Sequence, residues 1–118
     1  MSYDLAVWEG KRPRTNAAAA KVFRRLYDEN IGGEGERAPT PAIAAYVQAL
    51  LERWPDISDD EGEESPWSDG PLINDARGPI FYFGMVFSMC EEASAFAAGT
   101  AAAHGLVCFD PQLEELRP

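Results

Sequence analysis

The feature that most constrains this chain is the apolar run at residues 80–87, which reads Ile-Phe-Tyr-Phe-Gly-Met-Val-Phe. Successive side chains of a β-strand point to opposite faces of its sheet. Both sets of positions are apolar here, which is typical of a strand buried on both sides. The run therefore predicts a central strand that is buried on both sides.

Three other segments predict strands. Residues 3–8 alternate in a pattern that suits a strand, with Tyr3, Leu5 and Val7 on one face. Residues 70–73 and 106–109 are short apolar stretches bounded by Gly, Pro or Asp, and each predicts a short strand.

Helices are predicted between these strands. The first begins after Thr15 or Asn16 as N-cap and ends near Gly32. Thr40-Pro41 reads as an N-cap followed by proline in the first helical position, and Pro55 ends that second helix. A third helix follows Ser88-Met89-Cys90-Glu91, which fits a capping box, and ends at Gly105.

This element order predicts an α+β fold. It matches a ferredoxin-like β-α-α-β-β-α-β plan, with a four-stranded sheet and helices on one face. Right-handed crossovers place the first and third strands side by side at the sheet centre. The second face stays open unless the extra helix or a partner chain covers it.

Length and charge narrow the class of protein. A chain of 118 residues suits one domain, since domains cluster near ~100–150 residues. We expect that domain to span residues 1–112, with an acidic loop at 56–69 and a loose tail at 113–118. The net charge of -10 argues against nucleic acid and anionic membranes as partners.

The compartment is predicted from three observations. The sequence has no run of about 18 apolar residues that could span a membrane. Its N-terminus lacks the pattern of a signal peptide. Cys90 and Cys108 lie in apolar sequence surroundings, and their spacing is not that of metal ligands. We therefore expect a cytoplasmic protein with reduced thiols.

The charges are unevenly distributed. Residues 11–25 carry six basic side chains and no acid, whereas residues 56–69, the acidic segment, carry seven acids and no base. A solvated loop that maintains solubility is one interpretation of the acidic segment. The other is a docking surface for a basic partner, and its predicted contact residues are Asp59, Asp60, Glu61, Glu63, Glu64, Trp67 and Asp69.

Trp67 allows two interpretations, because nothing local explains a large ring among carboxylates. It folds back as a plug over the core, or it is an exposed anchor within a charged rim, as in an interface hot spot.

Enzymatic and metal sites find little support in the sequence. Glu91 and Glu92 disfavour a thiolate at Cys90, and His104 lies too far along the same predicted helix to activate it. An EF-hand that began at Asp56 would need glycine where Glu61 stands, and no Cys/His set suits zinc. We therefore predict no catalytic residues, no metal and no cofactor.

Four segments carry a resemblance to other proteins. Residues 2–8, Trp54-Pro55-Asp56, Ser65-Pro66-Trp67 and residues 105–112 resemble a group of small, acidic, uncharacterised proteins of high-GC, actinobacterial type. Proteins of this kind are similar in type to the immunity proteins of bacterial toxin systems. The resemblance implies direct binding of a protein partner and brings no catalytic motif.

The leading hypothesis is a protein-binding module, most concretely an immunity-type inhibitor of a basic partner such as a toxin. Two alternatives stay open. A small-molecule-binding or enzymatic domain would need a cavity lined by the Tyr82 or Phe83 face with convergent polar groups. A structural homodimer would bury the open sheet face against its twin.

Overall fold

The apolar run forms β3 (Ile80–Met85), which lies inside a five-stranded sheet. The structure is a computed structural model that describes residues 2–32, 37–56, 65–68 and 70–117. The strand order is β2-β3-β1-β4-β5, and neighbouring strands are antiparallel. Every side chain of β3 except that of Tyr82 is buried, which confirms an inner strand.

β1 (Tyr3–Trp8) lies between β3 and β4 (Val107–Asp110). Its Leu5 pairs with Phe83 of β3, and its Val7 pairs with Cys108 of β4. The first and third strands of the chain are therefore neighbours, as the crossover rule predicts. The short strands β2 (Ala76–Arg77) and β5 (Glu115–Leu116) form the two edges.

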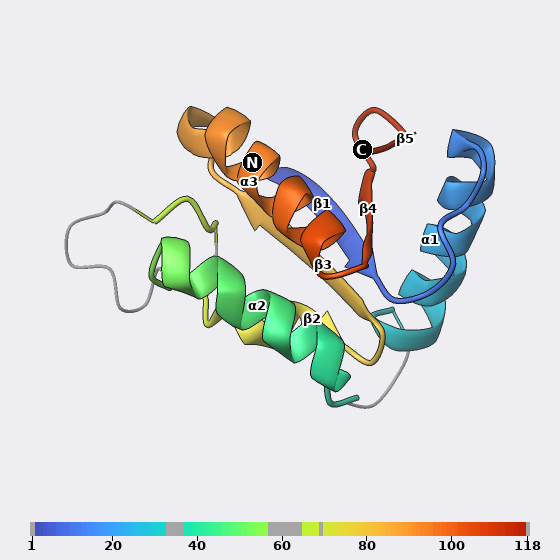
Figure 1. The fold of residues 1–118 in the computed structure, drawn as a ribbon, viewed down its shortest axis with the longest axis horizontal. Helices are drawn as coiled ribbons and strands as arrows, with labels where there is room; N and C mark the ends of the chain where they lie inside the picture. The colour runs from blue at the N-terminus through green and yellow to red at the C-terminus, as the bar shows by residue number, and fades with distance from the viewer. Residues whose placement is uncertain (1, 33–36, 57–64, 69, 118) are drawn as a thin grey trace.

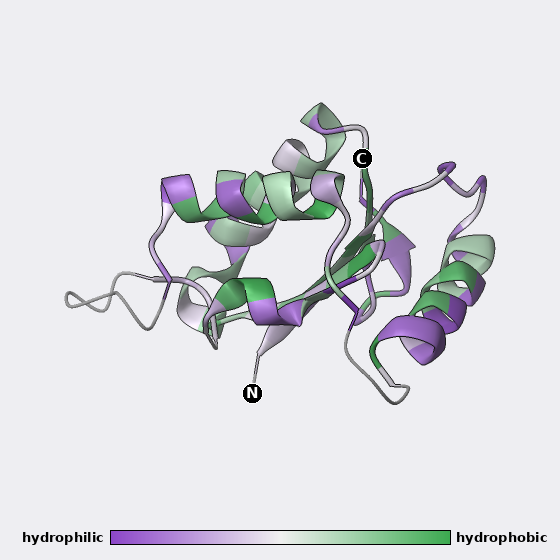
Figure 2. Cartoon of the chain, turned by 90° about the horizontal axis from the view of Figure 1, so that it is seen from below, coloured by the Kyte–Doolittle hydropathy of each residue, from purple (hydrophilic) through white to green (hydrophobic). Residues whose placement is uncertain are grey.

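Helices cover both faces of the sheet (Figure 1). α2 (Pro41–Arg53) and α3 (Cys90–Ala103) pack on one face, where Leu5 and Val7 join a core with Tyr46 and Ala97. α1 (Asn16–Asn30) packs on the other face, where Ala6 and Trp8 lie in a second core. Hydrophilic and hydrophobic residues both occur along α1, as expected of a helix with one covered side (Figure 2).

The four-stranded ferredoxin-like plan with helices on one face is therefore wrong, although the α+β class is confirmed. The first reason is the fifth strand. Residues 113–118 were expected to be a loose tail, but Leu116 pairs with Phe109 and the Arg117 amide donates to the Cys108 carbonyl oxygen at 2.8 Å. The second reason is α1, which covers the face that the plan left open.

Helix starts follow the local prediction. The side-chain oxygen of Thr15 accepts from the Ala18 amide at 3.0 Å, and that of Thr40 accepts from the Ile43 amide at 3.3 Å. The capping box before α3 is wrong, because Ser88 lies in the 3₁₀ turn η3 (Phe87–Met89) and α3 has no side-chain N-cap bond.

The strand predicted at residues 70–73 is also absent. Leu72–Asp75 forms a 3₁₀ turn, η2, and the strand β2 follows it instead. The Leu72 amide donates to Asp56 Oδ1 at 2.6 Å, and the Asn74 amide donates to the Pro71 carbonyl oxygen at 3.0 Å. These bonds occupy the amides that a strand would direct toward a neighbour.

Candidate functional site

Most of the predicted partner-binding residues fall outside the described part of the chain. This applies to the six acids Asp59, Asp60, Glu61, Glu63, Glu64 and Asp69. The structure does describe both flanks of the five acids at positions 59–64, at Asp56 and at residues 65–68. The site is therefore built from those flanks.

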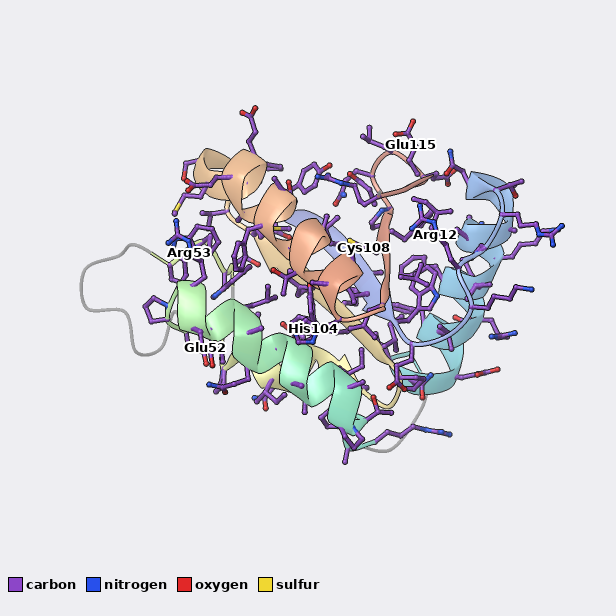
Figure 3. The ribbon with its side chains drawn as sticks, in the orientation of Figure 1. Arg12, Glu52, Arg53, His104, Cys108 and Glu115 are labelled. Carbon is purple, nitrogen blue, oxygen red and sulfur yellow. The ribbon has the colours of Figure 1, made fainter. Side chains whose placement is uncertain are left out.

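The N-terminal flank of the acidic segment is tied to η2. α2 ends at Arg53, and Asp56 then bonds the Leu72 amide through its Oδ1 atom. Arg53 stacks over the Trp54 ring at 4.1 Å and bonds Glu92 of α3 at 3.3 Å. Figure 3 shows Glu52 and Arg53 at this end of α2.

The C-terminal flank is held by Trp67, which is fully buried. Its indole Nε1 donates to the Trp54 carbonyl oxygen at 3.3 Å. Its ring meets Trp54 edge to face at 5.9 Å and Phe83 at 6.0 Å, between centroids. Of the two interpretations of Trp67, the structure confirms the one in which the ring folds back over the core. The prediction that Trp67 is an exposed partner-binding anchor is wrong.

Backbone bonds join the same flank to the end of β3. The Ser68 amide donates to the Gly84 carbonyl oxygen at 3.0 Å, and the Val86 amide donates to the Pro66 carbonyl oxygen at 2.7 Å. Both flanks of the acidic segment are consequently fixed to the folded core.

The basic side chains of residues 11–25 lie far from the described flanks of the acidic segment. Its extents are 40 × 30 × 27 Å, and α1 lies at the opposite end of the long axis from the flanks of the acidic segment (Figure 1). Lys21, Arg24 and Arg25 are exposed on α1, and Lys11, Arg12 and Arg14 are exposed just before it.

A polar pocket lies beside Ser68, at the N-terminal end of β1. Its volume is about 280 Å³, and we call it the Asp4 pocket; its lining residues are Ser2, Asp4, Ser68, Asp75, Tyr82, Phe83 and Gly84. Asp4 Oδ1 accepts from the Ser2 hydroxyl at 2.6 Å, and Asp4 Oδ2 accepts from the Tyr82 hydroxyl at 3.0 Å. The pocket thus combines two carboxyl side chains, of Asp4 and Asp75, with several hydroxyl groups.

Glycine at position 84 makes this arrangement sterically feasible. A Cβ atom on Gly84 would lie 2.6 Å from Ser68 Oγ, 2.8 Å from Asp4 Oδ1 and 2.8 Å from Ser2 Oγ. Those distances are far below van der Waals contact. The missing side chain therefore lets three oxygen atoms from separate residues meet over β3.

The charge of Asp4 has no cationic neighbour among the described residues. Ion pairs in that part of the chain, such as Arg25–Glu29 and Arg53–Glu92, do not involve Asp4. Burial, the bond to Asp4 and the charge of Asp4 together raise the pKa of Tyr82 to about 12. Tyr82 therefore stays protonated at neutral pH and donates to the carboxylate.

A hydrogen-bonded network holds the backbone of Asp4. Gln112 accepts from the Asp4 amide at 2.6 Å, and its Nε2 donates to the Asp4 carbonyl oxygen and to Asp110 Oδ1, each at 2.7 Å. Asp110 is fully buried and also accepts from the Tyr3 hydroxyl. These bonds fix the backbone from which the Asp4 side chain projects.

Sequence reasoning missed Asp4, Tyr82, Gln112 and Asp110 as members of one site. The sequence contained one sign that Asp4 is unusual. It is an acid in a predicted strand whose next four residues, 5–8, are all apolar. The contacts span the chain from Asp4 to Gln112, a separation of 108 residues. Only the fold brings such residues together.

The two cysteines differ in burial. Cys108 is buried, and this burial raises its pKa to about 12, although the charges of Arg117 and Arg12 lower it in part. Cys90 is half-buried at the start of α3, whereas His104 is exposed at the other end of that helix. Within the described ranges, no group of three or more His, Cys, Asp or Glu side chains could hold a metal ion.

A second pocket differs in character from the Asp4 pocket. It has a volume of about 290 Å³, includes Arg12 and Arg117, and lies along the start of β4 near Cys108. Figure 3 marks Arg12 and Cys108 in this region. Two small side chains of α3, Ala98 and Ala102, also line it.

The chain matches no protein-family model, no curated protein and no solved structure at a significant level. In the described part of the chain, no helix is long and apolar enough to cross a bilayer.

Proposed function

We propose that this chain is a cytoplasmic protein-binding module that recognises a basic protein partner through its acidic segment. The concrete form of the proposal is an immunity-type inhibitor of a toxin. The observation that carries it is the attachment of both flanks of the segment to the folded core, through Asp56 and Trp67. Five acids lie between these two points, at Asp59, Asp60, Glu61, Glu63 and Glu64.

The attachment has a thermodynamic consequence. A segment whose ends are fixed loses less conformational entropy on binding than one with free ends. Clustered negative charge also accelerates encounter with a basic surface. The role of Trp67 in this proposal is to hold the segment in place, and the acids make the contacts.

The Asp4 pocket supports a second candidate function, the binding of a small molecule. That alternative requires a cavity on the Tyr82 or Phe83 face with convergent polar groups, and the Asp4 pocket has this composition. The homodimer alternative loses its main support, because α1 occupies the sheet face that a twin would have covered.

The test of the partner proposal is affinity capture from native lysate with three baits. The first is the wild-type chain, and the second has Asp59, Asp60, Glu61, Glu63 and Glu64 changed to amides. The third is a matched control with amides at Glu9, Asp28, Glu52, Glu114 and Glu115, so both variants change the net charge from -10 to -5.

A near-stoichiometric basic protein that binds wild type and control but not the segment variant would support the proposal. Its binding should weaken as salt rises, because exposed charges are screened. Unchanged partner binding and unchanged salt dependence in the segment variant would overturn the proposal.

A further inference from the structure

The Asp4 pocket contains a negative charge that the described residues leave without a counterion. The Asp4 side chain is half-buried and receives two hydroxyl donors, from Ser2 and Tyr82. An ionised carboxylate has about four lone-pair sites, so it can accept further bonds. Partly desolvated charge without a counterion is costly, and a cation in the pocket would offset this cost.

The acceptor geometry favours a compact cation. Asp4 Oδ1, Ser2 Oγ and Ser68 Oγ all lie within 2.8 Å of one point over Gly84, so the three acceptors are closely clustered. A lysine ammonium offers three rotatable donors around one nitrogen, whereas an arginine guanidinium spreads its donors along a planar fork. A volume of about 280 Å³ suits a single side chain and is small for a drug-sized ligand.

We propose that the Asp4 pocket receives the ε-ammonium group of a lysine side chain from the basic partner. The inference rests on the proposed function, and it adds the chemical group recognised and the residues that recognise it. Ser68 connects the two sites, because it lines the pocket and directly follows Trp67 at the flank of the acidic segment. A docked lysine would thus lie beside the segment that attracts the partner.

The pocket can be tested without the partner, with n-butylammonium as the lysine side-chain analogue. Backbone-amide NMR spectra of the full chain are recorded during titration with this ion. Two controls of similar size are butyltrimethylammonium, which is charged but has no N–H donor, and n-butanol, which is neutral. We expect saturable shifts at Gly84 and Ser68 with n-butylammonium only.

Two variants make the test specific. D4N keeps the shape of the side chain and removes its charge, and we expect binding to weaken roughly ten- to a hundredfold, as for loss of a charged hydrogen bond. S68A keeps the charge and removes one acceptor, so it should weaken binding less and narrow the preference for n-butylammonium over butyltrimethylammonium. S68A also keeps the test valid if D4N fails to fold.

Equal shifts with both ammonium ions, no saturable shift in wild type, or unchanged binding by a folded D4N would each overturn the pocket assignment. Failure of the proposed function looks different. In that case n-butylammonium still binds at Gly84 and Ser68, while the segment variant captures the same proteins as wild type.

Discussion

Trp67 and Trp54 hold each other at the base of the acidic segment. The Trp67 indole nitrogen donates to the Trp54 carbonyl oxygen at 3.3 Å, and the two rings pack edge to face with centroids 5.9 Å apart. This residue pair therefore joins the end of α2 to the C-terminal flank of the acidic segment. The packing of the core and the attachment of this flank depend on the same pair.

Trp67→Ala should be strongly destabilising. Truncation of a fully buried tryptophan costs about 3–5 kcal/mol of unfolding free energy. Trp67→Phe retains most of the apolar contact but leaves the Trp54 carbonyl oxygen without its donor, which should cost about 1–3 kcal/mol. Denaturant unfolding measures both values.

Leu113→Ala is the control for the two Trp67 variants, because it truncates a large apolar side chain that is 62% exposed. Its effect should stay within about 0.5 kcal/mol. A Trp67→Ala variant as stable as Leu113→Ala would contradict the assignment of Trp67 to the core.

Two glycine substitutions should have opposite effects. Gly84→Ala would press a Cβ atom against Ser68 Oγ, Asp4 Oδ1 and Ser2 Oγ, and should destabilise the fold by about 1–3 kcal/mol. Gly99→Ala lies in α3 with nothing within 4 Å of its new Cβ, and should stabilise by about 0.5–1 kcal/mol. Thermal and denaturant unfolding of the two variants give the comparison, and a stabilising Gly84→Ala would show that the oxygen cluster over β3 is absent.

Local signals in the sequence predicted some of these elements correctly. Thr15 and Thr40 act as helix caps because the amides they bond lie three residues away. The inner position of β3 follows from its own composition. Such features need no knowledge of the rest of the chain.

Non-local contacts decided the elements that the sequence did not predict. α1 could have covered either face of the sheet, and its choice depends on a core with Trp8 and Phe109. The turn η2 replaces a strand because Asp56, sixteen residues earlier, accepts from the Leu72 amide. The Asp4 pocket needs Ser2, Ser68 and Gly84 together, and no short motif encodes that combination.

Alkaline pH should destabilise the folded chain. The pKa of Tyr82 is raised to about 12 from 10.0, first by burial and then by Asp4. Between these pH values the unfolded chain has lost the proton that the folded chain keeps, so the free energy of unfolding falls as pH rises. The contribution is fully present below pH 10.0 and disappears through about pH 12.

Tyr3 acts in the same direction, because burial and Asp110 raise its pKa to about 12. Denaturant unfolding should show a free energy of unfolding that falls as pH rises across this range. Tyr82→Phe should make the plot of this free energy against pH less steep, by an amount that corresponds to at most about one proton. A slope that is the same in Tyr82→Phe and wild type would contradict the bond between Tyr82 and Asp4.

The two thiols should differ in reactivity. Cys90 is half-buried, whereas Cys108 is buried and burial raises its pKa to about 12. Because the thiolate is the reactive form, a maleimide reagent should modify Cys90 first and reach Cys108 only after unfolding. Mass spectrometry during labelling measures the order, with Cys90→Ser as the control that isolates Cys108.

The most direct test of partner recognition by the acidic segment is the association rate of the captured partner. Rates are measured by stopped flow at low and moderate salt for wild type, the five-acid segment variant and the matched control of equal net charge. We predict that association slows, and loses most of its salt dependence, only in the segment variant. Equal slowing in both variants would show that net charge alone drives encounter, which contradicts a specific role for residues 56–69.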